Sequence, residues 1–410
     1  MSKHTLVSPV VIIGAGHAGG AAAFELRRAG FAGPVVLLGA EAHGPYQRPP
    51  LSKAWLKGDA SPEDIWLRDQ AWYAEADVEL RLKTQVVAID RQEQVVTLEG
   101  GEALPYGQLI LATGVRSRPL PLPGHALAGI YQLRDLSDAE ALKAALAQAE
   151  TVTLVGGGYI GLEVAAVARS QGKAVRVLEA DNRLMRRTAS AELAAHMARV
   201  HSQRDVDLRL GAQVVSFDGT DHVEGVTLAN GETLPTDLVI VAVGAVANDD
   251  LARDAGLACD QGVVVDAQAR TEDPHIFAIG DVAVRPFDTG PVRLESVHNA
   301  LEQAKQVAAH ITGRPLPRLS APWFWSDQYD QKIQIAGLMR PGLRPVVRQD
   351  GQQGPLSVFH LAGQQLVCVE AVNAPADYMA GKLMLEKGVP VRADQLADVG
   401  QDLRTLLQPA

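Results

Sequence analysis

The chain has 410 residues, 47% of them hydrophobic and 21% charged, a composition typical of a globular protein with more than one core. Its 48 acidic and 38 basic residues leave a net charge of −10, which argues against bulk binding to nucleic acid. The two cysteines, Cys259 and Cys368, form no C-x-x-C or C-x4-C pair. A redox-active dithiol, a cysteine-ligated iron–sulfur cluster and a disulfide scaffold are therefore not expected, and a reducing compartment is the simplest interpretation.

An apolar run at Val10–Ile13 leads into the sequence Gly14-Ala15-Gly16-His17-Ala18-Gly19. We expect a strand, a tight turn, a helix over Ala21–Ala29 that ends at Gly30, and a strand over Val35–Leu38. In a G-x-G-x-x-G turn the first glycine permits the turn, the second admits a pyrophosphate and the third lets the helix pack closely. The helix N-terminus then offers free N–H groups to phosphates. The motif predicts a dinucleotide site, in which Glu41, the nearest carboxylate after the second strand, is expected to reach a ribose hydroxyl.

The segment from Gly44 to Lys53 contains three prolines and is expected to be a loop. Because it carries Arg48 and Lys53, it is more typical of a ligand-binding loop than of a plain connection. Further strands are expected at Val78–Leu82, Thr84–Ile89, Val95–Leu98 and Leu109–Leu111, the last of which ends at Ala112-Thr113-Gly114. Three prolines between Arg116 and Pro123 indicate an interdomain linker.

A second glycine motif, Gly156-Gly157-Gly158-Tyr159-Ile160-Gly161, follows an expected helix over Ala139–Ala149 and a strand over Val152–Val155. A helix over Ile160–Ser170 and a strand over Val175–Leu178 come next. One such motif is weak evidence, but two in the same setting suggest two dinucleotides that face each other. That arrangement is the one needed to pass a hydride from a nicotinamide to a flavin.

Glu179 stands directly at the end of the strand that follows the second motif. A carboxylate there accepts hydrogen bonds from an adenosine ribose and repels a 2′-phosphate, so we expect NADH to be preferred over NADPH. Arg183, Arg186 and Arg187 follow closely and leave an alternative open. They could hold a 2′-phosphate, contact the NADH diphosphate, or form a solvated basic loop.

Later in the chain, strands are expected at Leu238–Val243, which ends at Gly244, and at Val263–Val265. The segment Ile276–Asp281 follows, with an apolar strand that ends before Gly280, and then a helix is expected over His298–Ile311. Asp281 is either an ordinary turn or cap residue or a ligand of a ribityl hydroxyl. From Pro322 the pattern changes to alternating strands typical of an α+β domain, at Lys332–Ala336, Leu356–Leu361 and Gln365–Val369. The alternation puts Trp323 and Trp325 on one face of a strand. They are either a pair of core residues, or one packs inward while the other covers a flavin.

No histidine spacing indicates a metal site, and no G-x-S-x-G motif indicates a hydrolase. The first strand begins too near Met1 to leave room for a signal peptide. No run reaches the roughly 18–20 apolar residues of a membrane span. These features predict a cytoplasmic protein that does not bind membranes.

Several motifs occur in a specific order: Gly14–Gly19, Arg48–Lys53, Ala112–Gly114, Gly156–Gly161 with Glu163, Ala278–Asp281, Glu295–Ala300 and Pro322–Tyr329. In this order the chain closely resembles the ferredoxin reductases of bacterial oxygenase systems, the putidaredoxin reductase type of glutathione-reductase-like flavoprotein without a redox dithiol. The resemblance implies an α/β fold with two Rossmann-like dinucleotide-binding domains and a C-terminal α+β interface domain. It divides the chain into a discontinuous FAD domain (1–117 and 245–320), an NADH domain (118–244) and the C-terminal domain (321–410).

The resemblance also implies the residues that bind each cofactor. FAD is expected at Gly14, Ala15, Gly16, Ala18, Gly19, Ala40, Glu41, Arg48, Lys53, Val86, Ala112, Thr113, Gly114, Arg134, Asp281, Val297 and Trp325. NADH is expected at Gly156, Gly158, Tyr159, Ile160, Gly161, Glu163, Glu179 and Gly244. Lys53 is expected near the flavin N5, paired with Glu163, and these two are the candidate catalytic residues. His298 replaces the residues usual at its position.

The expected activity is transfer of a hydride from NADH to FAD and of single electrons to a [2Fe–2S] ferredoxin that feeds a cytochrome P450 or a ring-hydroxylating oxygenase. Because such ferredoxins are usually acidic, transient docking is expected at basic residues, with Arg314, Arg318, Arg340, Arg344 and Lys387 as candidates. One alternative shares the same first half-reaction: a reductase of a small acceptor (oxygen, a quinone or a radical). Another, of a different class, is a flavoprotein like apoptosis-inducing factor, whose main role is interaction rather than turnover. A monomer and a weak dimer are both open.

Overall fold

The computed structural model describes residues 8–288, 290–351 and 354–407. The chain divides into two compact units. Unit one contains the residues up to Arg48, Ser61–Arg116 and Ala245–Leu319; unit two contains Pro49–Ala60, Ser117–Gly244 and the chain from Ser320 onward. The three-domain boundaries implied by the family resemblance stay a prediction.

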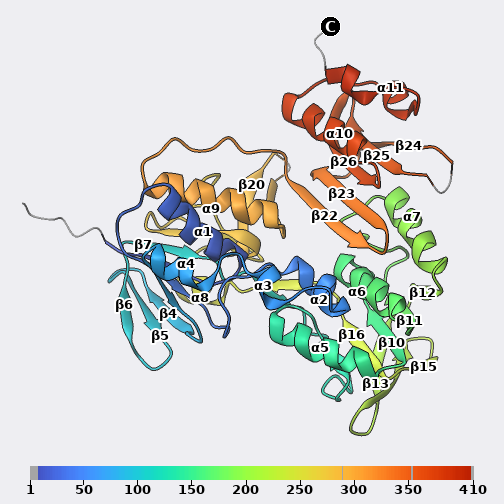
Figure 1. The fold of residues 1–410 in the computed structure, drawn as a ribbon, viewed down its shortest axis with the longest axis horizontal. Coiled ribbons are helices and arrows are strands. Elements are labelled where there is room, and N and C mark those ends of the chain that lie inside the picture. Colours follow the sequence, from blue (N-terminus) through green and yellow to red (C-terminus); the bar gives the residue numbers. More distant parts are fainter. Residues whose placement is uncertain (1–7, 289, 352–353, 408–410) are drawn as a thin grey trace, which may run out of the picture. The chain divides into compact units, whose positions relative to one another are not determined.

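Unit one is built on a parallel sheet with the strand order β19-β7-β1-β2-β3 (Figure 1). The first glycine motif follows β1, the central strand, which pairs with β2 on one side and β7 on the other. The elements of the unit are β1 (Val10–Ile13), α1 (His17–Arg28), β2 (Val35–Leu38), α3 (Pro62–Ile65), α4 (Gln70–Glu75), β3 (Val78–Arg81), β4 (Val86–Asp90), β5 (Val95–Leu98), β6 (Ala103–Pro105), β7 (Gln108–Leu111), β17 (Ala245–Ala247), α8 (Asp250–Asp254), β18 (Val263–Val264), β19 (Ile276–Ala278), η2 (Gly280–Val282), β20 (Ala283–Phe287), β21 (Gly290–Arg293) and α9 (Val297–Ile311), while β8 (Val115–Ser117) leads out of it.

Strand β1 is buried on both faces, which explains its unbroken apolar sequence. Val10 and Ile12 pack into a cluster with side chains of α1 and α9, and these two helices lie side by side on the sheet (Figure 1). Val11 and Ile13 point the other way, into a cluster with β4, β5 and α8. Each fully buried side chain of this kind contributes roughly 1.5–3 kcal/mol, so the alternation fixes the register of the central strand.

Helix α1 begins at His17, four residues before the predicted start at Ala21. The prediction was wrong there because glycines lower helix propensity, and Gly19 and Gly20 fall inside the helix. The structure gives the reason for both glycines. A side chain at Gly19 would collide with the carbonyl oxygen of Gly14, and one at Gly20 would lie 2.6 Å from the Cβ of Pro45.

Unit two contains a second parallel sheet, with the order β12-β11-β10-β16-β9, and the second glycine motif follows its central strand β10. Its elements are η1 (Pro49–Ser52), α2 (Ala54–Lys57), β9 (Ile130–Tyr131), α5 (Leu136–Gln148), β10 (Thr151–Val155), α6 (Tyr159–Ser170), β11 (Ala174–Glu179), α7 (Ala191–Ser202), β12 (Val206–Leu210), β13 (Val214–Gly219), β14 (Val223–Leu228), β15 (Thr233–Pro235) and β16 (Leu238–Val241).

The proline-rich loop is not irregular throughout. Pro49–Ser52 forms a 3₁₀ turn and Ala54–Lys57 a short helix that Gly58 ends in the left-handed conformation. This segment lies against α6 and α5: the Leu56 carbonyl accepts a hydrogen bond from Gln171 at 3.1 Å, and the Lys143 ammonium lies 5.4 Å from the centre of the Trp55 ring. These contacts hold it on unit two.

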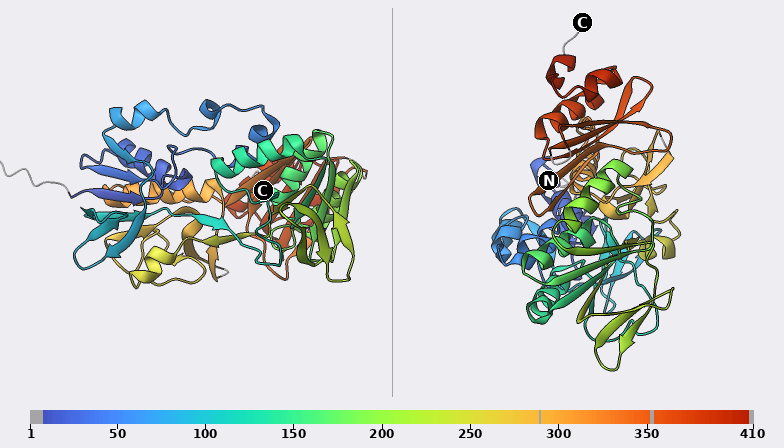
Figure 2. Two further views of the ribbon diagram at one scale, coloured as in Figure 1. Left: turned by 90° about the horizontal axis from the view of Figure 1, so that it is seen from below. Right: turned by 90° about the vertical axis from the view of Figure 1, so that its right-hand side faces the viewer.

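The C-terminal part of unit two is an antiparallel sheet with the order β22-β23-β26-β25-β24, covered by helices (Figures 1 and 2). Its core contains Phe359 and Val369 from the sheet and Tyr378 and Met384 from α10. The predicted strands are present, together with elements that were not predicted. The elements are β22 (Trp323–Gln328), β23 (Gln331–Gly337), β24 (Arg344–Gln349), β25 (Leu356–Ala362), β26 (Gln365–Val372), α10 (Pro375–Lys387), α11 (Ala393–Ala397) and η3 (Leu403–Leu407).

Helix α7 was not predicted, although Ser190 caps it through a hydrogen bond from the Leu193 amide. Its buried face contains His196 and His201 beside apolar residues. Histidines on that face interrupt the hydrophobic periodicity on which a helix prediction depends.

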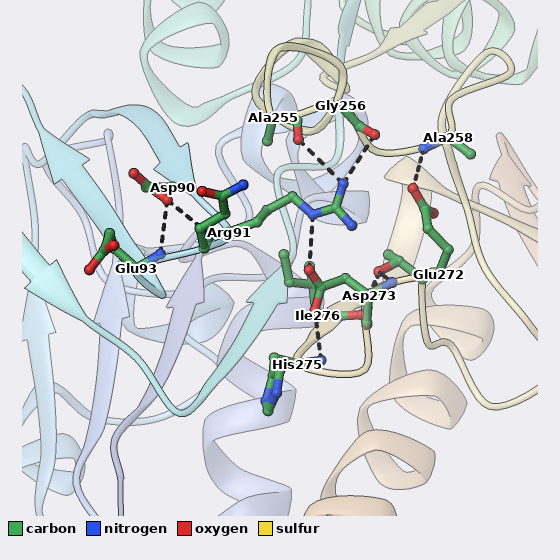
Figure 3. Close-up of polar contacts among 12 residues, drawn as sticks. Asp90, Arg91, Glu93, Ala255, Gly256, Ala258, Glu272, Asp273, His275 and Ile276 are labelled. Carbon is green, nitrogen blue, oxygen red and sulfur yellow. Dashed lines mark hydrogen bonds and ion pairs between the residues drawn. The ribbon is translucent and has the colours of Figure 1, made fainter.

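Arg91, in the turn between β4 and β5, ties together parts of unit one that are far apart in sequence (Figure 3). Its Nε donates to Asp273 Oδ2 at 2.9 Å, and its Nη1 donates to the Gly256 carbonyl, just beyond α8, at 3.2 Å. The Asp273 side chain is 11% exposed, so its charge depends on this partner.

We expect Arg91→Ala to lower the free energy of unfolding by about 2 kcal/mol, because it leaves the Asp273 carboxylate without its cation. Urea unfolding of the holoprotein measures this change. Arg404→Ala is the matched control, since Arg404 pairs with Asp402 on the surface with 78% of its side chain exposed, and it should have no measurable effect. Equal effects of the two substitutions would contradict this view of Arg91.

Candidate functional site

The first glycine motif forms a cradle in unit one. Gly14 has a φ of +110°, and a side chain there would collide with the carbonyl oxygen of Ala112, so both geometry and space require glycine. Gly16 differs, because the nearest atom to a Cβ built at this position is Nη2 of Arg48, 3.8 Å away. The protein itself leaves room for a side chain at Gly16. A ligand diphosphate that approaches the backbone here accounts for the glycine.

The N-terminus of α1 has unused hydrogen-bonding groups. Gly16 is its N-cap and provides no side-chain cap. The buried Nδ1 atom of His17 has no hydrogen-bond partner among the described residues. Burial lowers the pKa of His17, and the charges of Asp281 and Arg48 act on it in opposite directions, so both lie near this helix end. Uncapped N–H groups, an orphaned ring nitrogen and a nearby arginine fit a dinucleotide diphosphate.

Glu41 and Arg48 lie together at this cradle. Arg48 Nη2 donates to Glu41 Oε1 at 2.5 Å, and the Tyr46 hydroxyl donates to Glu41 Oε2 at 2.5 Å. Glu41 already accepts hydrogen bonds from Arg48 and Tyr46, so a ribose hydroxyl would have to donate to its remaining lone pairs. The predicted contact of Glu41 with a ribose stays a prediction.

The other predicted FAD residues are divided between the units. Ala15, Ala18, Ala40, Val86, Ala112, Thr113, Gly114, Asp281 and Val297 belong to unit one, whereas Lys53, Arg134 and Trp325 belong to unit two. Thr113 Oγ1 donates to the Asn248 carbonyl at 2.7 Å, which fixes the turn after β7. Their contacts with FAD stay predictions.

The second glycine motif repeats the geometry of the first in unit two. Gly156 has a φ of +108°, and a side chain there would collide with the Ala242 carbonyl oxygen; one at Gly161 would collide with the Gly156 carbonyl oxygen. No atom lies within 4 Å of a Cβ built at Gly158. Gly158 is the N-cap of α6 and provides no side-chain cap. The same three roles thus recur, with open space at the middle glycine.

Glu179 closes the second cradle at the end of β11. Its Oε2 accepts a hydrogen bond from the Gly157 amide at 2.7 Å, so the carboxylate is fixed on the glycine turn. Arg183 donates to the Ala189 and Arg186 carbonyls, and Arg186 pairs with Asp181 at 2.9 Å.

Arg187 is the member of the arginine cluster that is available to a ligand. It is exposed and has no hydrogen bond or ion pair within the described residues, and its guanidinium lies 2.9 Å from a Cβ built at Gly244. The alternatives for these arginines stay predictions, and Arg187 is the one whose guanidinium is not engaged by another described residue.

Two further predicted NADH residues begin α6. The side chain of Ile160 is 49% exposed at the helix start, an unusual position for a large apolar residue. The Tyr159 ring packs against Phe324 of β22 with 4.7 Å between the ring centres.

Glu163, one turn into α6, is the centre of the strongest polar cluster in unit two. Its side chain is 4% exposed and faces three donors. Lys53 Nζ lies 2.8 Å and Ser52 Oγ 2.5 Å from Glu163 Oε2, while Ser326 Oγ lies 2.6 Å from Oε1. The structure thus brings together Lys53 and Glu163, as the family resemblance implies. A buried carboxylate needs such partners, since loss of one from a buried ion pair costs about 3–5 kcal/mol.

Comparison with protein families identifies the chain. A model for pyridine nucleotide-disulphide oxidoreductases matches residues 8–304, and a model for a reductase C-terminal domain matches residues 323–407. The chain belongs to the pyridine nucleotide-disulphide oxidoreductase family.

Relatives in this family are ferredoxin reductases. The chain is 43% identical over 393 residues to a protein of Castellaniella defragrans named as a probable ferredoxin reductase, covering 95% of this chain and 96% of that protein. It is 42% identical to rhodocoxin reductase of Rhodococcus erythropolis, over 96% of this chain and 93% of the relative. The crystal structure of the covalent putidaredoxin reductase–putidaredoxin complex matches with a TM-score of 0.95 and 38% identity, covering 98% of each chain.

These matches confirm the resemblance and the predicted fold class, with two Rossmann-like parallel sheets and a C-terminal domain built on an antiparallel sheet. Among the described residues, no helix combines the length and apolar character that crossing a bilayer requires.

Sequence reasoning missed Ser52 and Ser326 as partners of Glu163, although both lie in motifs that carry the family resemblance. The signal for Ser326 was the alternation of β22, which places Ser326 on the face opposite Trp325. The target of its hydroxyl could not be read from spacing, because Glu163 is far away in the sequence.

We expect Gly158→Ala to leave the fold and the bound flavin intact while weakening NADH binding on the order of tenfold, because the added methyl occupies ligand space rather than protein space. Titration of the holoprotein with NADH measures the affinity. Gly161→Ala is the contrasting variant: its methyl would collide with a backbone oxygen, so it should lower the thermal stability. Unchanged NADH affinity in Gly158→Ala would remove this turn from the nucleotide site.

Proposed function

We propose that this protein is an FAD-dependent NADH:ferredoxin oxidoreductase that supplies single electrons to a [2Fe–2S] ferredoxin of a P450 or ring-hydroxylating oxygenase system. The observation that carries the proposal is the pair of glycine cradles, each with two glycines that the backbone requires and a middle one where the protein leaves room for a side chain. The relative from Castellaniella defragrans, which matches over nearly the whole chain, is named as a probable ferredoxin reductase.

FAD, when bound, accepts a hydride from a nicotinamide and gives up electrons one at a time. The first cradle, with Arg48 and the N-terminus of α1, would hold its diphosphate by charge and by free N–H groups. The second cradle would hold NADH in the same way, with Arg187 as a cation beside it. Glu179 would disfavour a 2′-phosphate, so NADH is the expected nucleotide.

Lys53 is assigned the role of placing a fixed positive charge near the reactive edge of the flavin. Its ammonium is held by the Glu163 carboxylate at 2.8 Å and by the Pro49 carbonyl at 3.1 Å, and its side chain is 17% exposed. An ammonium held this way is oriented before the reaction and stabilises developing negative charge without reorganisation. Glu163 orients Lys53 and balances its charge.

Electrons are expected to leave directly from the flavin to an external one-electron carrier, because the free Cys259 and Cys368 form no C-x-x-C or C-x4-C dithiol that could relay them. Arg314, Arg318, Arg340, Arg344 and Lys387 are exposed and have no ion pairs within the described ranges. They are the candidate contacts of an acidic ferredoxin, in a transient complex. We place the protein in the cytoplasm, where NADH is available and free thiols persist.

Anaerobic stopped flow of the FAD-loaded protein tests the proposal. NADH should bleach the flavin at least about tenfold faster than NADPH, since Glu179 repels the 2′-phosphate. Mixing with an oxidised [2Fe–2S] ferredoxin should then reduce the ferredoxin at a rate that falls as salt rises. Fast bleaching without transfer to any ferredoxin, together with rapid oxygen or quinone reduction, would replace the proposal with a small-acceptor reductase.

We expect Lys53→Ala to slow flavin reduction by NADH about a hundredfold, the size seen when one oriented electrostatic donor is removed. The measurement is the limiting rate constant at saturating NADH. Lys57→Ala is the matched control, because Lys57 lies four residues on, is exposed and should leave the rate unchanged. Equal rates in wild type and Lys53→Ala would exclude Lys53 from the mechanism.

A further inference from the structure

Glu163 is the inner end of a longer buried line of hydrogen bonds. Ser326 Oγ, which contacts Glu163, lies 3.3 Å from Gln328 Nε2. Gln328 Oε1 in turn lies 2.8 Å from His201 Nε2. Ser326, Gln328 and His201 are each 0% exposed. The line thus runs from α6 through β22 to α7, entirely within unit two.

The direction of every bond in the line follows from Glu163. An ionised carboxylate only accepts, so the single hydroxyl hydrogen of Ser326 must point to it. Ser326 Oγ can then only accept, and its donor is the amide NH₂ of Gln328. The amide oxygen of Gln328 therefore faces His201, whose Nε2 must carry the hydrogen. All donors point toward the carboxylate.

His201 is neutral at its end of the line. Burial lowers the pKa of His201 to about 4, with the charge of Arg204 acting in the same direction and the hydrogen bond to Gln328 opposing it. Its second nitrogen, Nδ1, faces the hydroxyl of Tyr329 at 3.5 Å. At neutral pH one tautomer, with hydrogen on Nε2, satisfies all of these contacts.

The outer end of the line is fixed in place by the turn between β22 and β23. Tyr329 has a φ of +55°, and the Arg204 guanidinium lies 4.6 Å from the centre of its ring. Arg204 also pairs with Asp330 at 2.5 Å. The turn is thus attached to α7, and the spacing of Ser326 and Gln328 on β22 places both on the face that continues the line.

We infer that Ser326 and Gln328 are positioning residues of the reductase reaction, which hold the Glu163 carboxylate aimed at Lys53. The inference rests on the proposed function, since it concerns the catalytic pair assigned there. Ser326 fixes one carboxylate oxygen, so that the other faces Lys53 and Ser52. Gln328 acts one hydrogen bond further from Lys53. Because its NH₂ group donates to Ser326 Oγ, the hydroxyl hydrogen of Ser326 has only the Glu163 carboxylate as acceptor. The C-terminal strand β22 thereby completes the catalytic pair.

The first test uses Ser326→Ala in the FAD-loaded protein, with single-turnover reduction by NADH over a range of NADH concentrations. We expect the limiting rate constant to fall about tenfold, as for loss of one charge-assisted hydrogen bond, while the NADH dissociation constant changes less than about twofold. Ser326→Thr, which keeps the hydroxyl, should restore most of the rate.

Ser357→Ala is the matched control. Ser357 is 1% exposed, belongs to the same antiparallel sheet and donates to a different carboxylate, Asp377 Oδ2, at 2.9 Å. A merely structural role for Ser326 predicts that both alanine variants lose stability and reduce the flavin at the wild-type rate. That result would overturn the inference.

The second test measures the direction of the line without turnover. In ¹⁵N-histidine NMR of the oxidised holoprotein, assigned with His201→Gln, the wild type should show hydrogen on Nε2 of His201 and no titration between pH 7 and about pH 5. In Ser326→Ala the Gln328 amide group can rotate by 180° and exchange its oxygen and NH₂ positions. Both neutral tautomers of His201 should then be populated. A single unchanged tautomer in that variant would remove Gln328 from the proposal.

The two tests separate this inference from the proposed function. If NADH does not reduce the wild-type flavin, the proposed function fails, whatever the NMR spectrum shows. If the wild type is reduced and Ser326→Ala is reduced equally fast, the inference alone fails.

Discussion

A buried carboxylate loses its hydration and needs partners inside the protein. The need to supply such partners to Glu163 organises unit two. The desolvation penalty of a buried ion is several kcal/mol, so partners must be supplied by the fold. Lys53 and Ser52 come from a segment that precedes α6 by about a hundred residues of chain, and Ser326 comes from a strand that follows it at even greater distance. The charge is satisfied only when all three segments are in place. Formation of the Lys53–Glu163 pair, which is proposed to be catalytic, is thus coupled to the folding of the C-terminal sheet against α6.

The two glycine cradles have the same backbone conformation but differ in the charged residues around them. In both, the first glycine lies against a backbone carbonyl just after the neighbouring strand. A Cβ at the middle glycine would meet no close contact: Arg48 Nη2 lies 3.8 Å from one built at Gly16, and nothing lies within 4 Å of one built at Gly158. Their charges differ. In unit one the nearest carboxylate, Glu41, is paired with Arg48, which leaves the cradle with a cation at its edge. In unit two Glu179 is hydrogen-bonded to the glycine turn itself, so its charge is fixed where the proposal places the adenosine ribose.

The sequence predicted what local pattern determines and missed what long-range contacts determine. The central strands, both glycine turns and the pairing of Lys53 with Glu163 were predicted, the last through the family resemblance. The early start of α1 was missed because the tight packing of Gly19 overrides its propensity. Helix α7 was missed because its buried face includes His201, whose partner Gln328 lies on a distant strand. The predicted cofactor contacts that are divided between the two units stay predictions.

The C-terminal sheet is attached to α6 and α7 by buried polar contacts as well as by apolar area. Besides Ser326, the sheet contributes Glu370, which is 1% exposed and accepts hydrogen bonds from the Ser190 amide at the start of α7 and from His360, each at 2.9 Å. Polar groups buried in this way stabilise only one arrangement, because any shift leaves a charge or a donor unpaired. The sheet therefore fixes both α6 and α7 against it, and a domain expected to serve as an interface also sets the geometry of the residues proposed for catalysis.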